Sequence, residues 1–271
     1  MKISIVIVTY NRLHALAELL ESISRQTLKP FEIVIVNDAG ESVQELIELY
    51  HELPIQLIEL KENVKHVRAR NIAVSKTSGD AIMLADDDDY FTTGHIERMA
   101  AALREYDFVY SDVEIVSFNT TDHTRIPTSR RLFAYNDDLE EMRRFSTYVP
   151  SGSLYKKEIH EQIGMFDPDI HNYWDWDFFL RVAKSFKIKR VPVASVIYAF
   201  SNTGNHQSSQ LNEKRQHYLN KLSAKHQLGE LSTKNFFVLL EEPEMKNREA
   251  ESEVVWDGKP MHSRLVKRTF S

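Results

Sequence analysis

The chain has 271 residues, of which 42% are hydrophobic and 27% are charged, proportions close to those of ordinary globular proteins. This composition excludes collagen-like, low-complexity and wholly disordered chains. Lys and Arg number 34 against 40 Asp and Glu, so the formal net charge is −6, which argues against general nucleic-acid binding. Because there is no cysteine, disulfides, thiolate zinc sites, iron–sulfur clusters and cysteine nucleophiles are excluded.

The chain offers no candidate for a membrane-spanning helix. Its first apolar run, residues 3–9, is too short to span a bilayer and has no small-residue cleavage site. No other stretch reaches about eighteen consecutive apolar residues. We therefore expect a cytoplasmic protein without a transmembrane segment, and peripheral contact with a membrane surface stays open.

Residues 1–90 alternate between strand and helix patterns. β-branched apolar runs predict buried strands at residues 3–8, 32–36, 55–60 and 81–84. Apolar residues at helical spacing predict helices at residues 13–23, 43–50 and 66–76. Asn11 is the predicted cap of the first of these helices. The alternation predicts an α/β protein with a Rossmann-like, mostly parallel sheet, right-handed crossovers and helices on both faces.

The periodicity weakens after residue 107. Short strands, some of them antiparallel, are predicted at residues 108–110, 113–116 and 152–155, with a strand pair at 191–200 broken at Pro192. Amphipathic helices are predicted at residues 173–184 and 211–226. Polar residues 120–131 predict a mobile loop, and the tail from about residue 241 is expected to be an added arm or partly disordered.

Three polar clusters follow predicted strands, at residues 9–12, 37–38 and 86–89. Ligands of parallel α/β sheets bind beyond the carboxyl ends of the strands, so these clusters mark the expected site. The last cluster is four consecutive aspartates, whose mutual repulsion a bound hard cation would offset through oxygen ligands. The alternative is a solvated acidic turn in which Asp89 or a neighbour caps the next helix.

Several familiar nucleotide and hydrolase motifs are absent. The chain has no Gly-x-Gly-x-x-Gly after the first strand, no Gly-x-x-x-x-Gly-Lys and no Gly-x-Ser-x-Gly. Arg68 and Arg70 lie in one helical turn, where they face a pyrophosphate or simply form a solvated face. His206 follows a turn-forming Gly-Asn pair and could reach a phosphate, although a lone histidine is more often a surface or packing residue.

The second informative stretch surrounds Asp175, which is predicted in the first turn of a helix, where the dipole favours a carboxylate. Trp174 and Trp176 flank it, and aromatic faces commonly line sugar sites, so they are candidates for acceptor binding. The alternative is that Asp175 or Asp177 is an ordinary helix acid, with Arg181 pairing to Asp177 four residues away.

These segments together resemble inverting family 2 glycosyltransferases with the GT-A fold. The resemblance begins at residues 4–12, Ser-Ile-Val-Ile-Val-Thr-Tyr-Asn-Arg. It continues in the family's order at residues 32–38, 69–71, 78–80, 86–89 and 175–181. It covers about residues 1–200 and implies a nucleotide-sugar donor, usually UDP-linked, a hydroxyl acceptor such as a glycan, and a Mn²⁺ or Mg²⁺ ion. Polysaccharide biosynthesis is typical of the family.

The resemblance also assigns residues to the nucleotide. Thr9, Tyr10 and Asp38 would hold the uracil and its ribose edge, and Arg12 closes the same opening motif. Arg70 would help to neutralise the leaving diphosphate.

Two roles remain, the metal and the catalytic base. Asp86 and Asp88 correspond to the two acids of the DxD motif: Asp88 would meet the metal, with Asp86 as a second candidate, while Asp86 or Asp87 would reach the ribose. With four adjacent acids the register is ambiguous by one position. His206 is a further candidate for the diphosphate or metal, and Asp175 corresponds to the catalytic base. The chain departs from the family at the position before this base, which is often acidic in relatives and is a tryptophan here.

The resemblance implies a glycosyltransferase domain at residues 1–209. Its nucleotide-binding half is residues 1–110, and its acceptor half, with a small antiparallel portion, is residues 111–209. Residues 210–271 lie outside the resemblance and are expected to form a C-terminal helix and tail.

Two other functions fit parts of the pattern. A nucleotidyltransferase would also use paired acids and a metal, but it should carry a glycine-rich loop after the first strand, and residues 9–12 contain no glycine. A non-catalytic nucleotide-sugar-binding module would bind UDP without turnover, and the presence of Asp88 and Asp175 argues against it.

Overall fold

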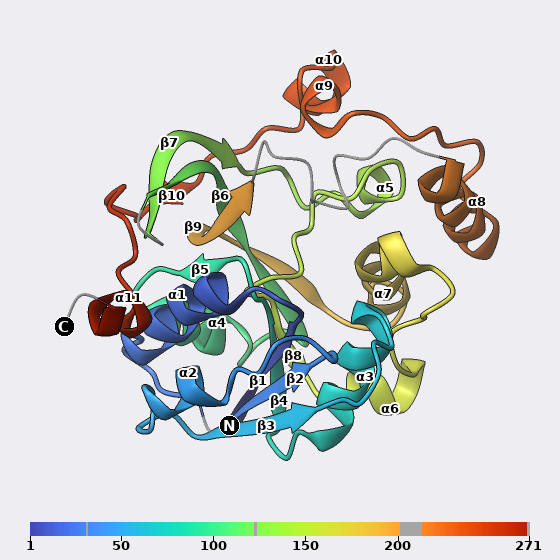
Figure 1. Ribbon diagram of the computed structural model, residues 1–271. Coiled ribbons are helices and arrows are strands. Elements are labelled where there is room, and N and C mark those ends of the chain that lie inside the picture. Colours follow the sequence, from blue (N-terminus) through green and yellow to red (C-terminus); the bar gives the residue numbers. More distant parts are fainter. Residues whose placement is uncertain (31, 122–123, 201–212, 270–271) are drawn as a thin grey trace.

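The computed structural model describes residues 1–30, 32–121, 124–200 and 213–269 (Figure 1). The elements of the first half are β1 (Ile3–Thr9), α1 (Leu13–Ser24), β2 (Glu32–Asn37), α2 (Gln44–Glu48), β3 (Ile55–Glu59), α3 (His66–Lys76), β4 (Ala81–Asp86), β5 (Tyr90–Phe91) and α4 (His95–Ala102). The elements of the second half are β6 (Phe108–Thr121), β7 (Thr124–Phe133), α5 (Leu139–Met142), β8 (Leu154–Lys156), α6 (Ile159–Ile163), the 3₁₀ helix η1 (His171–Tyr173), α7 (Trp174–Val182), β9 (Ile188–Phe200), α8 (Glu213–His226), α9 (Phe236–Leu240), α10 (Pro243–Lys246), β10 (Glu253–Val254) and α11 (Arg264–Thr269).

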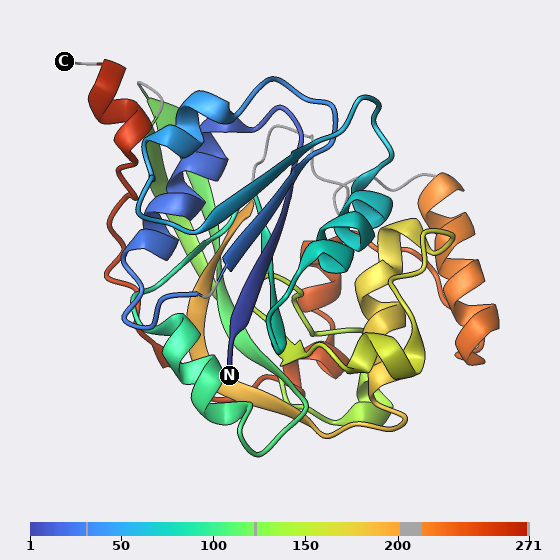
Figure 2. The same cartoon turned by 90° about the horizontal axis from the view of Figure 1, so that it is seen from below.

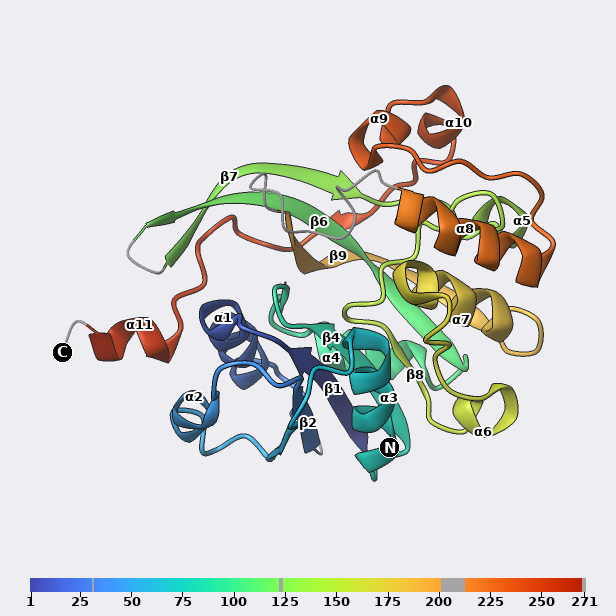
Figure 3. The ribbon, with the colours of Figure 1, turned by 45° about the vertical axis from the view of Figure 1, so that its right-hand side comes forward.

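The strands of the described chain form one sheet in the order β10-β9-β6-β8-β4-β1-β2-β3, with β5 added on β9 and β7 on β6. β1 to β4 are mutually parallel, β8 runs antiparallel to both β4 and β6, and β9 runs parallel to β6. The predicted mostly parallel sheet with a small antiparallel portion is therefore confirmed. Figure 3 shows the parallel strands in the lower part of the molecule and the long second-half strands above them.

Alternation along the buried strands sends successive side chains to opposite faces of the sheet. Ile5 and Ile7 pack with α1, α2 and α4 in one core, whereas Val6 packs with α3, α6 and α7 in a second core on the other face. All three side chains are fully buried, as expected for strands covered on both faces. The view from below in Figure 2 shows the two helical layers on either side of the strands.

The second half is more regular than its sequence suggested. The two predicted strands at residues 108–110 and 113–116 are parts of the single long strand β6. The loop predicted at residues 120–131 is wrong, because Thr124–Phe133 forms β7, which pairs antiparallel with β6. Its polar alternation reflects an edge strand with one solvated face, a pattern that a short window does not distinguish from a loop.

Pro192 does not break the strand that contains it. β9 runs from Ile188 to Phe200, and its pairing with β6 jumps from Ser111 opposite Val191 to Asp112 opposite Ala194. The proline therefore lies in a bulge, where the ladder needs no backbone N–H from it. The predicted interruption is a local shift of register inside one strand.

The tail beyond residue 240 is ordered through residue 269 and packs on the rest of the chain, so the expectation of disorder is wrong for these residues. β10 adds to β9 as a parallel strand, and α11 packs beside α1. The Arg264 side chain donates to the carbonyl of Leu49 at 2.7 Å, and its backbone N–H donates to the hydroxyl of Tyr50 at 3.1 Å. Such long-range anchors leave no periodic signal in the tail's own sequence.

Asn11 does not cap the first helix. It adopts a left-handed backbone with φ of 55°, and its Oδ1 accepts a hydrogen bond from the Glu41 backbone at 2.8 Å, which ties the loop after β1 to the loop after β2. Of the helices in the described ranges, none combines the length and apolar character that a bilayer-crossing segment needs.

Candidate active site

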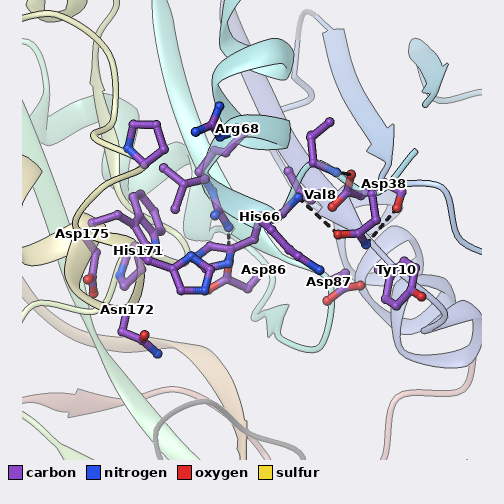
Figure 4. A pocket seen from close by; sticks show the side chains of 18 of the residues that line it. Val8, Tyr10, Asp38, His66, Arg68, Asp86, Asp87, His171, Asn172 and Asp175 are labelled. Carbon is purple, nitrogen blue, oxygen red and sulfur yellow. Dashed lines mark hydrogen bonds and ion pairs between the residues drawn. The ribbon is translucent and has the colours of Figure 1, made fainter. Parts of the chain in front are cut away.

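A cavity of about 930 Å³ opens at the carboxyl ends of β1, β2 and β4. Figure 4 shows Tyr10 and Asp38 at one end and Asn172 and Asp175 at the other, with Asp86 between them. The predicted site residues that line this cavity are Thr9, Tyr10, Arg12, Asp38, Arg70, Asp86, Asp87, Asp88, Trp174 and Asp175. Trp176 lines a neighbouring cavity, and His206 lies outside the described residues.

The Asp38 end is built by backbone contacts between strand ends. The Asp38 backbone N–H donates to the Thr9 carbonyl at 2.9 Å, which fixes the loop after β2 beside the end of β1. Its carboxylate Oδ1 accepts from the Val64 backbone N–H at 2.7 Å, and Asn63 donates to its carbonyl at 3.1 Å. The Tyr10 ring, half exposed, stands at the rim. A buried carboxylate beside an accessible ring suits a planar base that carries N–H groups.

Three of the four aspartates face the cavity, and the fourth does not. Asp86, Asp87 and Asp88 line it, whereas Asp89 is fully buried and its Oδ1 accepts from the Ala199 backbone N–H of β9 at 3.0 Å. Burial raises the pKa of Asp89 well above its usual value, with the Asp88 charge reinforcing it. Asp89 caps no helix, because α4 begins after Gly94. The candidate ligands within the run are thus the first three acids.

The guanidinium groups of Arg12 and Arg70 pair with these acids. Arg70 donates to Asp86 at 2.5 Å, and Arg12 donates to Asp87 at 3.2 Å and also to Asp88. Burial and the adjacent Asp88 carboxylate nevertheless raise the pKa of Asp87 to about 7. Burial likewise raises the pKa of Asp86, against the opposing charge of Arg70. The two arginines that pair with Asp86, Asp87 and Asp88 therefore offset the charge of these three acids only in part.

Of Arg12 and Arg70, Arg70 is the more buried. Its guanidinium group lies over the Trp174 ring, 4.2 Å from the ring centroid. Trp174 therefore supports a cation that faces the acids. Its other ring contacts include Phe166, edge-on at 4.8 Å. This packing fixes the Arg70 head group in the cavity wall, whereas Arg68 of the same turn is exposed at the rim. Arg70, which the resemblance assigned to the diphosphate, and Arg68 thus have different environments.

Asp175 and Asp177 differ sharply although they are two residues apart on α7. Asp175 lines the cavity, and desolvation, reinforced by the Asp86 charge, raises its pKa to about 6. Asp177 is fully buried, and its carboxylate accepts from Arg181 of the same helix at 2.9 Å and from His226 of α8 at 2.8 Å. Against the effect of burial, the His226 hydrogen bond and the charges of Arg181 and Lys225 lower the pKa of Asp177 to about 2. The ordinary helix acid is therefore Asp177.

Among the polar cavity residues that the sequence analysis did not identify are His66, His171, Asn172, Lys214 and Arg215. His66 is the first residue of α3, after the loop of residues 60–65 that follows β3, and no motif in the sequence marked it. Burial, with the charges of Arg70 and His171, lowers the pKa of His66 to about 3, so this ring is neutral. The other four come from η1 and α8, and no local pattern in those segments marks them.

Within the described residues, no three His, Asp or Glu side chains cluster as a ready-made metal site. Asp86 and Asp88 nevertheless present carboxylate oxygens to the cavity. Mg²⁺ and similar hard cations are commonly held by one or two carboxylates with substrate phosphates and water completing the shell. The donor set therefore fits a cation that binds together with a diphosphate.

Comparison with known proteins gives the family. The model of glycosyl transferase family 2 matches residues 4–164. The uncharacterized glycosyltransferase YwdF of Bacillus subtilis (strain 168) is 66% identical over 265 residues, 98% of this chain and 99% of YwdF. The poly(ribitol-phosphate) beta-N-acetylglucosaminyltransferase TarS of Staphylococcus aureus (strain Mu50) is 28% identical over 134 residues, which are 48% of this chain and 23% of TarS. The chain thus spans nearly all of YwdF but only a small part of TarS.

Solved structures show the same fold. Crystal structures of S. aureus TarS 1–349 in complex with UDP-GlcNAc and with UDP match with TM-scores of 0.64 and 0.63, at 20% and 18% sequence identity. The matches cover 83% and 91% of this chain, and 66% and 77% of the TarS chain. The chain therefore belongs to glycosyl transferase family 2 and is a glycosyltransferase with the GT-A fold.

Proposed function

We propose that the protein is a metal-dependent inverting glycosyltransferase that moves a sugar from a UDP-sugar to an acceptor hydroxyl. The observation that carries the proposal is the order of groups along the cavity in Figure 4: Asp38 and Tyr10, then the acidic run at Asp86, then Asp175. This order matches the order of parts in a nucleotide sugar, which are base, diphosphate and anomeric carbon. A volume of about 930 Å³ accommodates such a donor.

The nucleotide would bind at the Asp38 end. With Oδ1 held by the Val64 N–H, Asp38 would offer Oδ2 to a base N–H, and Tyr10 would cover the ring. Thr9 at the end of β1 also lines this cavity, which makes it a further candidate for the nucleotide. The complexes of S. aureus TarS 1–349 with UDP and with UDP-GlcNAc support uracil as the base.

The diphosphate would lie over the acidic run. It brings further negative charge beside Asp86, Asp87 and Asp88, while Arg12 and Arg70 are already paired with those acids. This imbalance supports a requirement for a divalent cation, which Asp88 and Asp86 would hold. When bound, Mn²⁺ or Mg²⁺ would neutralise charge on the departing diphosphate.

Asp175 would act as the general base. The acceptor oxygen attacks the anomeric carbon, the bond between that carbon and the diphosphate oxygen breaks, and the acceptor proton passes to Asp175. A carboxylate with a pKa of about 6 is ionised at neutral pH and remains basic enough to take a proton in the transition state. A single displacement of this kind inverts the anomeric configuration, which supports the inverting assignment.

A thermal-shift screen of nucleotide sugars with Mn²⁺ or with EDTA, followed by assay of UDP release, tests the proposal. We expect one UDP-sugar to raise the melting temperature more with Mn²⁺ than with EDTA, by an amount equivalent to about 2.7 kcal/mol at a hundredfold excess over Kd. Preference for a donor with another base would refute the assignment of a UDP-sugar as donor. Equal shifts with Mn²⁺ and with EDTA would refute the requirement for a metal ion. Binding without any turnover would favour the non-catalytic module.

A further inference from the structure

A second, smaller cavity of about 170 Å³ adjoins the large one at Asp175, and none of the four consecutive aspartates lines it. Its walls are rich in aromatic residues and come from parts of the chain distant in sequence, including β7, the segment before β8, η1, α7 and α9. The aromatic residues that matter here are Phe133, Phe145, Tyr148, Tyr173, Trp176 and Phe236. None of these six lines the large cavity, so the two cavities differ in chemistry as well as in size.

Asp175 lines both cavities, together with Pro150, Asn172, Tyr198 and Arg215. Asp175 therefore lies where the two cavities meet. A donor bound along the large cavity would bring its anomeric carbon to one side of this junction. A hydroxyl placed at the mouth of the small cavity would reach Asp175 from the other side, as an in-line displacement requires.

The aromatic walls are held in place by their own contacts. The Trp176 indole N–H donates to the Met142 carbonyl at 2.8 Å, and its ring meets Phe145 and Tyr173 edge-on, at 6.4 and 6.2 Å between centroids. Arg215 donates to the Tyr173 hydroxyl at 3.1 Å. The walls are therefore preorganised, which lowers the entropic cost of binding a ligand between them.

The size of the cavity limits what it can hold. An apolar cavity of about 150 Å³ in another protein holds one benzene molecule, so 170 Å³ is enough for about one six-membered ring. Aromatic faces carry partial negative charge and attract the C–H groups of a saturated ring. Asn172, Asp175 and Arg215, which also line the large cavity, supply polar groups where the two cavities meet. This distribution suits a ring with C–H faces and a hydroxyl at one edge.

We propose that this cavity is the acceptor subsite and takes the terminal pyranose ring of a glycan, with the nucleophilic hydroxyl directed at Asp175. The assignment rests on the proposed glycosyltransferase function and names its acceptor class. In the reaction the acceptor oxygen bonds to the anomeric carbon, the nucleoside diphosphate leaves, and the acceptor proton goes to Asp175. An open-chain polyol lacks a flat face for the walls and loses more rotational freedom on binding.

The three tryptophans of the chain make a direct test possible, because two of them report on different cavities. Their indole N–H signals in ¹⁵N-labelled protein are assigned with Trp→Phe variants. UDP with Mn²⁺ should shift the Trp174 signal. In the presence of both, methyl pyranosides of several configurations are titrated to about 50 mM, since single sugars bind on the order of 1 mM. The alditols of the same sugars are titrated in parallel.

We expect at least one methyl pyranoside to shift the Trp176 signal saturably, with at least tenfold tighter binding than its alditol. Val149→Phe, which adds a ring to the wall of the small cavity alone, should weaken pyranoside binding at least tenfold and leave UDP affinity unchanged. Val238→Phe on exposed α9 is the matched control and should change neither. Should Val149→Phe misfold, Phe236→Ala removes one wall and should weaken the pyranoside in the same selective way.

The two proposals fail differently. If UDP shifts Trp174 while no pyranoside shifts Trp176, or while an alditol binds as tightly, the acceptor subsite is refuted and the donor site stands. If neither UDP nor a UDP-sugar binds, the proposed function itself is refuted. If Val149→Phe or Phe236→Ala folds and binds the pyranoside normally, the sugar sits elsewhere and the assignment of this cavity is wrong.

Discussion

Replacing Asp175 by asparagine tests its role as general base, because the substitution exchanges one carboxylate oxygen for an NH₂ group and leaves the shape of the side chain almost unchanged. Asparagine cannot accept the acceptor proton, so turnover should fall by about 10²–10⁴, the usual range for loss of a general base. This corresponds to about 2.7–5.5 kcal/mol in the activation barrier. UDP affinity should be nearly unchanged, because the Asp38 end of the cavity is separate from Asp175 (Figure 4).

The same substitution should not cost stability. The rise of the Asp175 pKa from 3.8 to about 6 means that ionisation costs the folded state up to about 3 kcal/mol at neutral pH. Because the folded pKa is raised, the unfolded chain loses this proton first, so stability falls as pH rises from about 4 to 6. The variant escapes this cost and loses only about 0.3–1 kcal/mol of helix-dipole stabilisation. Its melting temperature at pH 7 should rise by a few degrees.

The assay combines three measurements on Asp175→Asn: melting temperature, UDP affinity by calorimetry, and transfer rate against pH. In the native enzyme kcat/KM should rise with pH through about 6 and then level off, and the variant should lose that limb. Asp169→Asn, on the exposed rim of the same cavity, is the matched control and should behave as the native protein. A variant that is less stable but nearly fully active would refute the role of Asp175.

Three further predictions concern the donor site and the fold. Asp88→Ala should abolish the part of the UDP thermal shift that depends on Mn²⁺, and an unchanged Mn²⁺ dependence would remove Asp88 from the metal site. Asp38→Asn keeps an acceptor for the Val64 N–H but removes the charge, and calorimetry should show UDP weakened by roughly 1.5–3 kcal/mol. Asp177→Ala should destabilise the fold by about 3–5 kcal/mol because it leaves the cations of α7 and α8 without their buried partner. Since the pKa of Asp177 is lowered to about 2, its ionised form stabilises the fold above about pH 4, and this stabilisation is lost towards pH 2. Acid denaturation should therefore show a loss of stability between these pH values in the native protein but not in the variant.

Local sequence patterns were enough for the first half of the fold. The strands β1 to β4 and the helices between them follow from β-branched runs and helical periodicity, since both faces of the sheet are covered and the runs are continuously apolar. Because parallel strands end at one edge, the polar residues after β1, β2 and β4 had to meet there. The sequence by itself thus determined the parallel strands of the first half and the polar residues that their ends contribute to the cavity.

The second half depends on contacts that no short window contains. β7 alternates polar residues because one of its faces is solvated, and Pro192 is tolerated because the β6–β9 register shifts beside it. The sequence predicts the helix α8 but not its place against the cavities, to which α8 supplies Arg215 and the later helix α9 supplies Phe236. These segments are stabilised by packing against distant elements, so their own residues carry little information about their place.

The direction of individual side chains was decided only by the tertiary structure. The sequence held four equivalent aspartates, and the fold turns Asp89 into the interior against β9 while the first three face the cavity. It likewise exposes Asp175 to both cavities and pairs Asp177 with α8. Neighbouring positions on a strand or a helix point in different directions, so the chemistry of each depends on what the folded chain places opposite it. The sequence determined which residue types gather at the sheet edge, and the packing of distant elements decided which of them can act.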